Sequence, residues 1–381
     1  MKFQSKTEIH YGQHSIDYVK TLNAKFAFVV ADELMVKLEL VKKVTDLLDL
    51  QGIPYEVFDS IEPNPSLETV KQGLDKIIKS KPDLLIAVGG GSVIDAAKAI
   101  MYFCIKTKEE LIESDAIRKP WFVAIPTTSG TGSEVTAFSV ITDTQRQIKI
   151  PVVSTVMIPD AAILDPEFTR TVPPFVTADT GMDVLVHAIE TYVSKEASDF
   201  TDIYAKKAIK QVFTYLVRAY KNGNDMEARQ MMQEASCMAG IGFTNAGLGV
   251  NHSLAHAVGG HFKISHGRAN AILLPTVIAY NARLNNPLHS VAARYTSLAK
   301  ALGFPADTEE EGVQSLVAAV QYLNRQLEIP SCFEVHGIDP ITYMAQIDIM
   351  TKNAMEDTCT PSNPRKPQPK DLKDLLIKAL Y

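Results

Sequence analysis

The stretch "IAVGGGSVIDAAKAI", residues 86–100, carries the strongest indication of the fold. An apolar run ends in three consecutive glycines, and helix-forming residues follow Ser92 directly. This order predicts a buried strand, a tight turn and a helix. Backbone N–H groups in such a turn can approach a phosphate closely, and the helix N-terminus adds partial positive charge. The stretch matches neither the GxGxxG nor the Walker motif, so a phosphate site and a plain turn both remain open.

Similar apolar runs recur through the first half of the chain, at 25–32, 55–60, 83–90 and 121–127. Helical patterns separate them, as at 40–52, which ends at Gly52, and at 66–80, which begins at Ser66. Strands that alternate with helices predict βαβ units and a parallel sheet. Residues 138–154 differ, because two alternating runs flank a polar turn, and this pattern predicts a hairpin.

The second half of the chain has a different pattern. Prolines punctuate residues 164–174, and almost every later segment has helical periodicity. A chain of 381 residues also exceeds the size at which a single core stops growing. We therefore expect an α/β, doubly wound, Rossmann-like domain over 1–172 and an all-α domain over 173–381.

The composition is that of an ordinary soluble protein, with 46% hydrophobic and 22% charged residues. The formal net charge is −6 and there is no block of Lys and Arg, which argues against a nucleic-acid partner and for a small molecule. The N-terminus lacks an apolar signal segment and no run of 18 apolar residues occurs. The four cysteines form no CxxC pair, so we expect free thiols in a cytoplasmic protein without membrane contact.

A second loop, "IPTTSGTGSEVT" at 125–136, follows the strand predicted at 121–127. Two such loops at successive strand ends form a crevice in which a dinucleotide can lie. Asp32 ends an earlier strand, where its carboxylate could bind the adenosine ribose and repel a 2′-phosphate, favouring NAD over NADP. Asp32 could equally cap the helix that follows.

A metal site is indicated in "TADTGMDVLVHAIETYVS", residues 177–194. Asp183 and His187 are spaced i and i+4 there, so their side chains share one face of the helix and can meet one cation. The neighbouring side chains are apolar, and a buried Asp and His need either each other or another partner. A direct Asp–His hydrogen bond is the alternative.

Four of the nine histidines lie in "GVNHSLAHAVGGHFKISHG", residues 249–267. His252 and His256 are one helical turn apart, and His266 follows ten residues after His256. Spacing alone would choose His252 and His256 as a ligand pair, but periodicity does not settle the choice.

Five motifs occur in the same order as in a known family: "GGGSVIDAAKAI", "PTTSGTGSEVT", "TGMDVLVHAIE", "GLGVNHSLAHAVGGHFKISHG" and the C-terminal "NPR". Together they resemble the iron-containing (group III) alcohol dehydrogenase family, over nearly the whole chain. The resemblance implies a dehydroquinate synthase-like fold with an N-terminal dinucleotide-binding domain and a C-terminal metal-binding and substrate domain. It implies that the metal ligands are Asp183, His187, His252 and His266. His256 then matches an active-site histidine near the nicotinamide that is not a ligand, and His261 matches no motif position.

The same resemblance implies an NAD(H) site. Its contacts would come from Asp32, Asn64, Gly90, Gly91, Ser92, Asp95, Thr127, Thr128, Thr131, Thr136, Phe138 and Lys149. The substrate pocket would be lined by Phe243, Asp357 and Cys359. Fe(II) is the expected metal because all three histidines are present, with Zn(II) as the alternative, since Asp plus three His suits either ion.

The resemblance predicts hydride transfer between a nicotinamide and a short-chain primary alcohol or its aldehyde, with the ion as Lewis acid and His256 handling the proton. Within the family, the closest likeness is to 1-propanol dehydrogenases. A polyol (glycerol or 1,3-propanediol) dehydrogenase, a lyase of the dehydroquinate synthase type and a non-catalytic binding module are the alternatives. The lyase normally uses a glutamate ligand and several cations for its anionic substrate, which this pocket does not offer. A homodimer is expected, with the strand predicted at 7–12 as a pairing edge, and a bacterial microcompartment is an alternative location within the cytoplasm.

Overall fold

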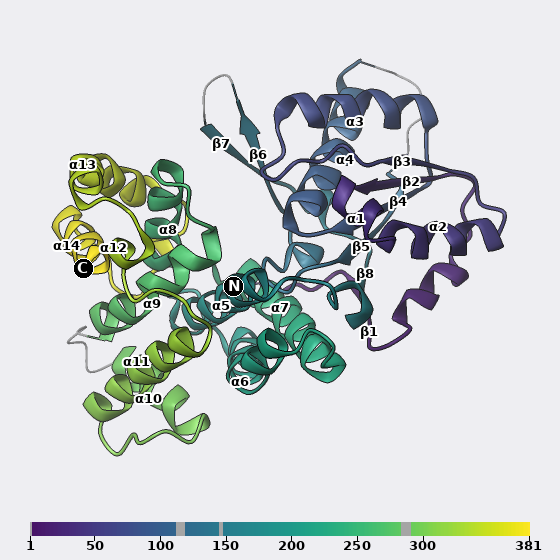
Figure 1. Ribbon diagram of the computed structural model, residues 1–381. Helices are drawn as coiled ribbons and strands as arrows, with labels where there is room; N and C mark the ends of the chain where they lie inside the picture. The colour runs from purple at the N-terminus through teal and green to yellow at the C-terminus, as the bar shows by residue number, and fades with distance from the viewer. Residues whose placement is uncertain (1, 112–118, 145–147, 283–290) are drawn as a thin grey trace. The chain divides into compact units, whose positions relative to one another are not determined.

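The computed structural model describes residues 2–111, 119–144, 148–282 and 291–381. The chain folds into two compact units (Figure 1). One comprises Gln4–Val172, and the other comprises Pro173–Tyr381 together with the N-terminal residues up to Phe3. Each unit is described by itself below.

The first unit is built on a six-stranded, entirely parallel sheet in the order β1-β8-β5-β4-β2-β3. Its strands are β1 (Glu8–Tyr11), β2 (Ala27–Ala31), β3 (Tyr55–Phe58), β4 (Leu84–Gly89), β5 (Trp121–Pro126) and β8 (Ala161–Leu164). The predicted parallel α/β sheet is thereby confirmed. β8 was not anticipated, because its four residues are too few to show a period in the sequence.

Helices cover both faces of this sheet: α1 (Glu33–Lys37), α2 (Leu40–Leu50), α3 (Leu67–Ser80) and α4 (Gly91–Leu111). Alternate residues of β2 point to opposite faces. Phe28 and Val30 belong to the core shared with α3 and α4, whereas Ala27 and Val29 belong to the core shared with α2. The sheet is therefore doubly wound, as expected. Ser66 caps α3 as predicted, since its side chain accepts a hydrogen bond from the backbone of Thr69.

The hairpin predicted at 138–154 is also confirmed. β6 (Phe138–Asp143) and β7 (Ile148–Val153) pair antiparallel as a separate two-stranded sheet. Asp95 of α4 holds the hairpin, because its Oδ2 accepts a hydrogen bond from the backbone N–H of Val140 at 3.0 Å. The hairpin is thus fixed to the helix that begins at the glycine turn.

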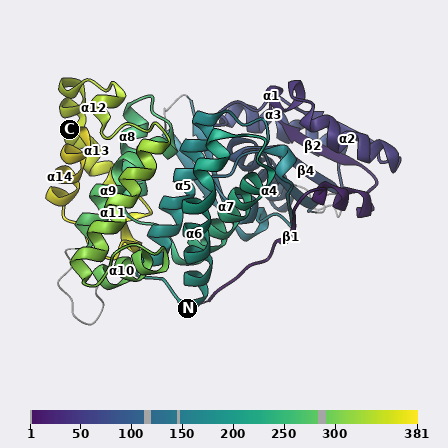
Figure 2. The same cartoon turned by 60° about the horizontal axis from the view of Figure 1, so that its bottom comes forward.

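The second unit consists of helices, as predicted (Figure 2). They are α5 (Pro174–Val193), α6 (Asp199–Lys221), α7 (Met226–Ala246), α8 (Val250–His261), α9 (His266–Ala282), α10 (Val291–Ala301), α11 (Glu309–Gln326), α12 (Phe333–His336), α13 (Pro340–Glu356) and α14 (Pro369–Leu380). Every residue of α5 from Gly181 to Val193 is buried, so this helix forms the centre of the unit. α6, α7 and α9 pack directly against it. No helix among the described residues is long and apolar enough to span a membrane.

Candidate metal centre and cofactor loops

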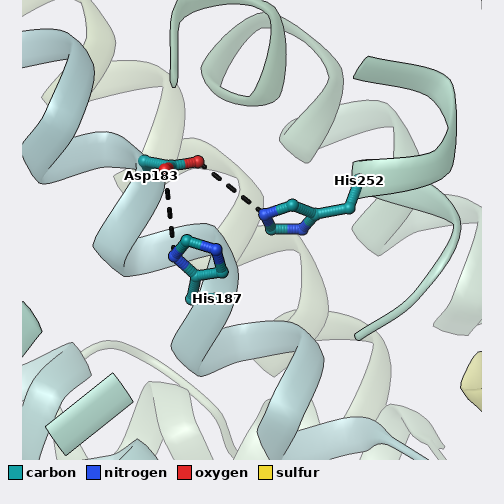
Figure 3. Close-up of side chains that lie close together, drawn as sticks. All are labelled: Asp183, His187 and His252. Carbon is teal, nitrogen blue, oxygen red and sulfur yellow. Dashed lines mark ion pairs between the residues drawn. The ribbon is translucent and has the colours of Figure 1, made fainter. Parts of the chain in front are cut away.

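Asp183 and His187 lie on successive turns of the buried helix α5, with relative exposures of only 4% and 5%. His187 Nδ1 is 3.9 Å from Asp183 Oδ2 (Figure 3). This separation is too long for a hydrogen bond. The two side chains therefore face each other without forming a hydrogen bond. The alternative of a direct Asp–His hydrogen bond is thus disfavoured.

His252 of α8 faces the other oxygen of the same carboxylate (Figure 3). Its Nε2 is 3.7 Å from Asp183 Oδ1, and its ring stacks on that of His187 with the centroids 4.4 Å apart. His252 Nε2 is buried and has no hydrogen-bond partner among the described residues. A buried polar atom in this state requires another partner.

The other nitrogen of His252 is bound to Glu190, whose Oε2 lies 2.5 Å from Nδ1. Burial raises the pKa of Glu190 to about 8, although backbone N–H groups lower it. Burial also holds the pKa of His252 well below its usual range, and the neighbouring imidazoles add to this effect. A cation beside Nε2 would favour the ionised form of Glu190. His252 would then donate its Nδ1–H to the Glu190 carboxylate, as metal-binding histidines commonly do with their second N–H.

His266, the first residue of α9, completes the group around Asp183. Its Nε2 lies 3.5 Å from Asp183 Oδ1, and its side chain is 41% exposed. The amide of Asn270 donates to Asp183 Oδ1 at 2.7 Å and lies 3.1 Å from His266 Nε2. Three imidazoles from three helices thus converge on one carboxylate.

Asp183, His187 and His252 could hold a metal ion, because one ligand atom from each lies within 4.8 Å of the others, and His266 Nε2 lies beside the same carboxylate. Ligand atoms bound to such an ion at about 2.1 Å in a tetrahedral arrangement are roughly 3.4 Å apart. Asp183 Oδ1 is 3.5 Å from His266 Nε2 and 3.7 Å from His252 Nε2, and Asp183 Oδ2 is 3.9 Å from His187 Nδ1, so the separations are slightly longer than in such an arrangement. One carboxylate oxygen and three imidazole nitrogens are a donor set suited to Fe(II) or Zn(II).

His256 has a different environment from His252, although the two are one turn apart. Its Nδ1 lies 2.9 Å from Asp357 Oδ2, and its ring stacks on His266 with the centroids 5.1 Å apart. It groups with Asp357 and Cys359, whereas His252 groups with Asp183 and His187. Burial raises the pKa of Asp357, but the hydrogen bond and charge of His256 and the backbone N–H of Cys359 hold it at about 2. Asp357 is therefore a carboxylate that only accepts hydrogen bonds.

The three residues predicted to line a substrate pocket lie beside these imidazoles. Phe243 stacks on His187 with ring centroids 4.7 Å apart. The backbone N–H of Cys359 donates to Asp357 Oδ1 at 2.8 Å, which ties both residues to His256.

The glycine and threonine loops lie together in the other unit. A Cβ added to Gly90 would lie 3.3 Å from Thr128 Oγ1, and one added to Gly91 would lie 2.7 Å from Thr131 Cγ2. The backbone N–H of Thr127 donates to Gly89 O at 3.0 Å. The glycines therefore allow the threonine loop to approach the first turn of α4, where backbone N–H groups can bind a phosphate.

Comparisons with known proteins agree with this geometry. The family model described as "Iron-containing alcohol dehydrogenase" matches residues 6–166, and "Fe-containing alcohol dehydrogenase family, C-terminal" matches residues 177–380. The chain belongs to the iron-containing alcohol dehydrogenase family. The family resemblance predicted from the five motifs is thus confirmed, and the protein is an oxidoreductase; the lyase alternative is not favoured.

Relatives of known name are similar over the full length of the chain. It is 40% identical to the NADPH-dependent butanol dehydrogenase of Clostridium saccharobutylicum, covering 100% of this chain and 98% of that protein. It is also 40% identical to the 1-propanol dehydrogenase PduQ of Citrobacter freundii, covering 99% of each. A similar match to an aldehyde-alcohol dehydrogenase of Streptococcus pneumoniae covers 46% of that longer protein. The solved iron-containing alcohol dehydrogenase of Thermococcus thioreducens is 34% identical with a TM-score of 0.90, covering 99% of each chain.

In this iron-containing alcohol dehydrogenase, several residues predicted to contact the cofactor have internal partners. Asp95 Oδ1 accepts a hydrogen bond from Ser133 Oγ at 2.6 Å. The ammonium of Lys98 donates to Ser133 Oγ, Thr136 Oγ1 and the carbonyl of Phe138, at 2.7, 2.9 and 2.8 Å. These bonds tie the threonine loop and the hairpin to α4.

The remaining predicted cofactor residues are more dispersed. Asp32 Oδ1 accepts from the backbone N–H of Met35 at 2.9 Å and so caps α1, the alternative that the sequence left open. Asn64 has a left-handed backbone, with φ of 56°, and its N–H donates to Ser92 Oγ at 3.3 Å. The Phe138 side chain is 41% exposed, and Lys149 lies on β7 opposite Thr142. Outside the predicted set, His261 Nδ1 lies 2.9 Å from the carbonyl of Ala257, at the end of α8.

Sequence reasoning missed Lys98, Glu134 and Glu190. Lys98 is fully buried, and burial lowers its pKa to about 8, whereas burial raises the pKa of Glu134 to about 7. One signal was available for Lys98 and Glu190, because each stands among apolar residues of a predicted helix, and a buried charged residue requires a partner. Apart from Asp95, which precedes Lys98 by three residues, their partners lie too far along the chain to be recognised by spacing.

Proposed function

We propose that the protein is an iron-dependent, NAD(H)-linked dehydrogenase that interconverts short-chain primary alcohols and their aldehydes. The observation that carries this proposal is the convergence of His187, His252 and His266 on the carboxylate of Asp183. We assign these four residues as the metal ligands. Fe(II) is preferred over Zn(II) because the chain belongs to the iron-containing family and offers three imidazoles.

The glycine and threonine loops are proposed as the nicotinamide dinucleotide site. The first turn of α4 offers backbone N–H groups to the pyrophosphate. Gly90, Gly91, Thr128 and Thr131 bring the two loops close enough to contact one ligand. NAD(H) is favoured over NADP(H) because Asp32 places a carboxylate at the end of β2, where it would repel a 2′-phosphate. The butanol dehydrogenase relative is named for NADPH, so both cofactors belong in the assay.

When bound, the metal ion supplies a Lewis acid that stabilises negative charge on the oxygen of the alcohol or aldehyde. His256 is proposed to move the proton. Because the Asp357 carboxylate accepts from Nδ1, it fixes the tautomer in which His256 Nε2 carries the lone pair. His256 Nε2 then accepts the hydroxyl proton during alcohol oxidation and returns it during aldehyde reduction. With its side chain 44% exposed, His256 can exchange that proton with water.

Short unbranched alcohols are the proposed substrates. Phe243 and Cys359 offer apolar surface beside the metal group, and neither adds a cation that would bind an anionic substrate. The names of the butanol and 1-propanol dehydrogenase relatives support the same substrate class. A polyol such as glycerol or 1,3-propanediol is the alternative.

The test is to purify the protein anaerobically, load it with Fe(II), and follow NADH and NADPH absorbance. Ethanol, 1-propanol, 1,2-propanediol, glycerol and the matching aldehydes form the substrate panel. We expect the highest kcat/KM with an unbranched primary alcohol or its aldehyde and with NAD(H). Absence of turnover with every pair, from protein carrying one metal per chain, would contradict the proposal.

We also propose that the enzyme is a cytoplasmic homodimer. All four cysteines are free thiols, which suits a reducing compartment. Among the described strands, β1 lies at one edge of the parallel sheet. The backbone N–H and C=O groups along that edge could pair with a second copy of the chain. Sedimentation velocity tests the assembly, because a monomer at micromolar concentration would contradict the homodimer.

A further inference from the structure

His266 is the most exposed of the four residues proposed as metal ligands. It begins α9, and its side chain is 41% exposed. The side chains of Asp183, His187 and His252 are 6%, 7% and 1% exposed and stand within helices. Packing therefore fixes those three, whereas the direction of His266 depends on how the first turn of α9 is held.

Asp179 holds that turn from α5, one turn before Asp183. Its Oδ2 accepts a hydrogen bond from Ser265 Oγ at 2.5 Å, and its Oδ1 accepts from Arg268 Nε at 2.9 Å. These donors stand one residue before and two residues after His266. Asp179 and Arg268 are only 11% and 20% exposed, so their ion pair is shielded from water more than a surface pair is.

Gly267 brings the two backbones together at the same place. A Cβ added to Gly267 would lie 2.0 Å from the carbonyl oxygen of Asp179. No side chain can be accommodated at that distance, so only glycine allows α9 to begin directly against α5. Asp179 and Asp183 lie on the same face of α5, because they are four residues apart. The contact at Asp179 therefore fixes where α9 begins along α5, and so fixes the position and direction of the His266 side chain relative to Asp183.

We propose that Asp179 is a positioning residue for the metal site, acting through Ser265 and Arg268 on His266. This inference rests on the proposed function, since it assigns His266 as a ligand. Asp179 is not assigned as a ligand, because its two carboxylate oxygens accept hydrogen bonds from Ser265 and Arg268. Its carboxylate fixes the α9 turn so that His266 Nε2 is already directed at Asp183 before the metal binds, which avoids the cost of ordering that turn on binding.

The test compares Co(II) binding by the wild type and Asp179→Asn, using competition with a chromophoric chelator and the visible spectrum of the bound Co(II). Asparagine keeps the shape of the side chain but loses the charge that pairs with Arg268. We expect the affinity to fall about tenfold to a hundredfold, as for other residues that support a ligand from outside the metal shell. The Co(II) spectrum should shift towards that of His266→Ala.

A double-mutant cycle separates this positioning from general destabilisation. If Asp179 acts through His266, adding Asp179→Asn to His266→Ala should lower the remaining Co(II) affinity no further. Asp225→Asn is the matched control, because Asp225 pairs with Arg218 Nε at 2.9 Å in the same unit, away from the metal group. The control should bind Co(II) like the wild type.

Unchanged affinity in Asp179→Asn, an additive loss in the double variant, or an equal loss in Asp225→Asn would each overturn the inference. Failure of the wild type to bind Co(II) would instead remove the metal site of the proposed function. Should Asp179→Asn not fold, Ser265→Ala removes one of the two hydrogen bonds. A smaller loss of affinity in the same direction is then expected, and no loss would overturn the inference.

Discussion

Glu190 Oε2 lies 2.5 Å from His252 Nδ1, and both residues are almost completely buried. The contact joins α5 to α8 and leaves His252 Nε2 facing Asp183. A carboxylate that accepts the second N–H of a ligand histidine fixes the ring and raises the basicity of the coordinating nitrogen. Glu190 is therefore expected to support the metal site without belonging to the ligand set.

Glu190→Gln should lower metal affinity about tenfold to a hundredfold, because the amide cannot supply the negative charge. Chelator competition measures this loss. Glu227→Gln is the control, since Glu227 is 61% exposed and pairs with Arg218 away from the site. Equal metal affinity of Glu190→Gln and the wild type would show that the charge of Glu190 does not support metal binding through His252.

Asp32→Ala should relax the choice between the cofactors. The substitution removes the carboxylate that would repel a 2′-phosphate, so the KM for NADP should fall relative to that for NAD. It also removes the cap of α1, and the free energy of unfolding should fall by about 1 kcal/mol. Steady-state KM values for both cofactors and a urea titration separate the two effects. If the ratio of the KM values for NADP and NAD is unchanged while the free energy of unfolding falls, Asp32 only caps α1 and does not select the cofactor.

Lys98→Met should loosen the cofactor loops. The substitution leaves Asp95 and Glu134 buried without their cation and removes three hydrogen bonds to the threonine loop and hairpin. We expect a loss of about 3 kcal/mol in unfolding free energy and a higher KM for the dinucleotide. Lys119→Met is the comparison, because Lys119 pairs with Asp160 nearer the surface and should contribute about 1 kcal/mol or less. Equal losses in the two variants would contradict the importance of the Lys98 network.

The same lysine should make stability depend on alkaline pH. Burial lowers the pKa of Lys98 from 10.5 to about 8. Between these values the unfolded chain holds more of this proton than the folded chain, so Lys98 makes the folded state more stable as the pH rises. Urea unfolding at pH 7.5, 8.5 and 9.5 should show the stability difference between the wild type and Lys98→Met growing, by at most about 1.4 kcal/mol per pH unit. A constant difference would mean that Lys98 titrates as an ordinary lysine.

The parts of the fold and site that the sequence predicts are those with local periodicity. The apolar runs of β2, β3, β4 and β5, the cap at Ser66 and the hairpin at 138–154 follow from neighbouring residues, and the structure contains them all. The spacing of Asp183 and His187 likewise placed both on one buried helix face.

What the sequence could not predict depends on contacts between distant segments. Glu190 and His252 are 62 residues apart, and Asp179 and Arg268 are 89 residues apart. Such pairs are selected by the packing of α8 and α9 against α5, which leaves no periodic pattern. His252 and His256 are four residues apart on α8, so their spacing would allow both to bind one cation. The same packing nevertheless directs His252 towards Asp183 and His256 towards Asp357.

The most direct test of the four-ligand site is the metal content of the anaerobically purified, Fe(II)-loaded wild type, His266→Ala and His256→Ala. We predict one iron per chain in the wild type and in His256→Ala, with turnover of the latter reduced about a hundredfold to ten-thousandfold by loss of the proton-handling group. His266→Ala should hold far less iron. An equal loss of iron from both variants would contradict this assignment and would place His256 among the residues that hold the metal, as its spacing from His252 predicts.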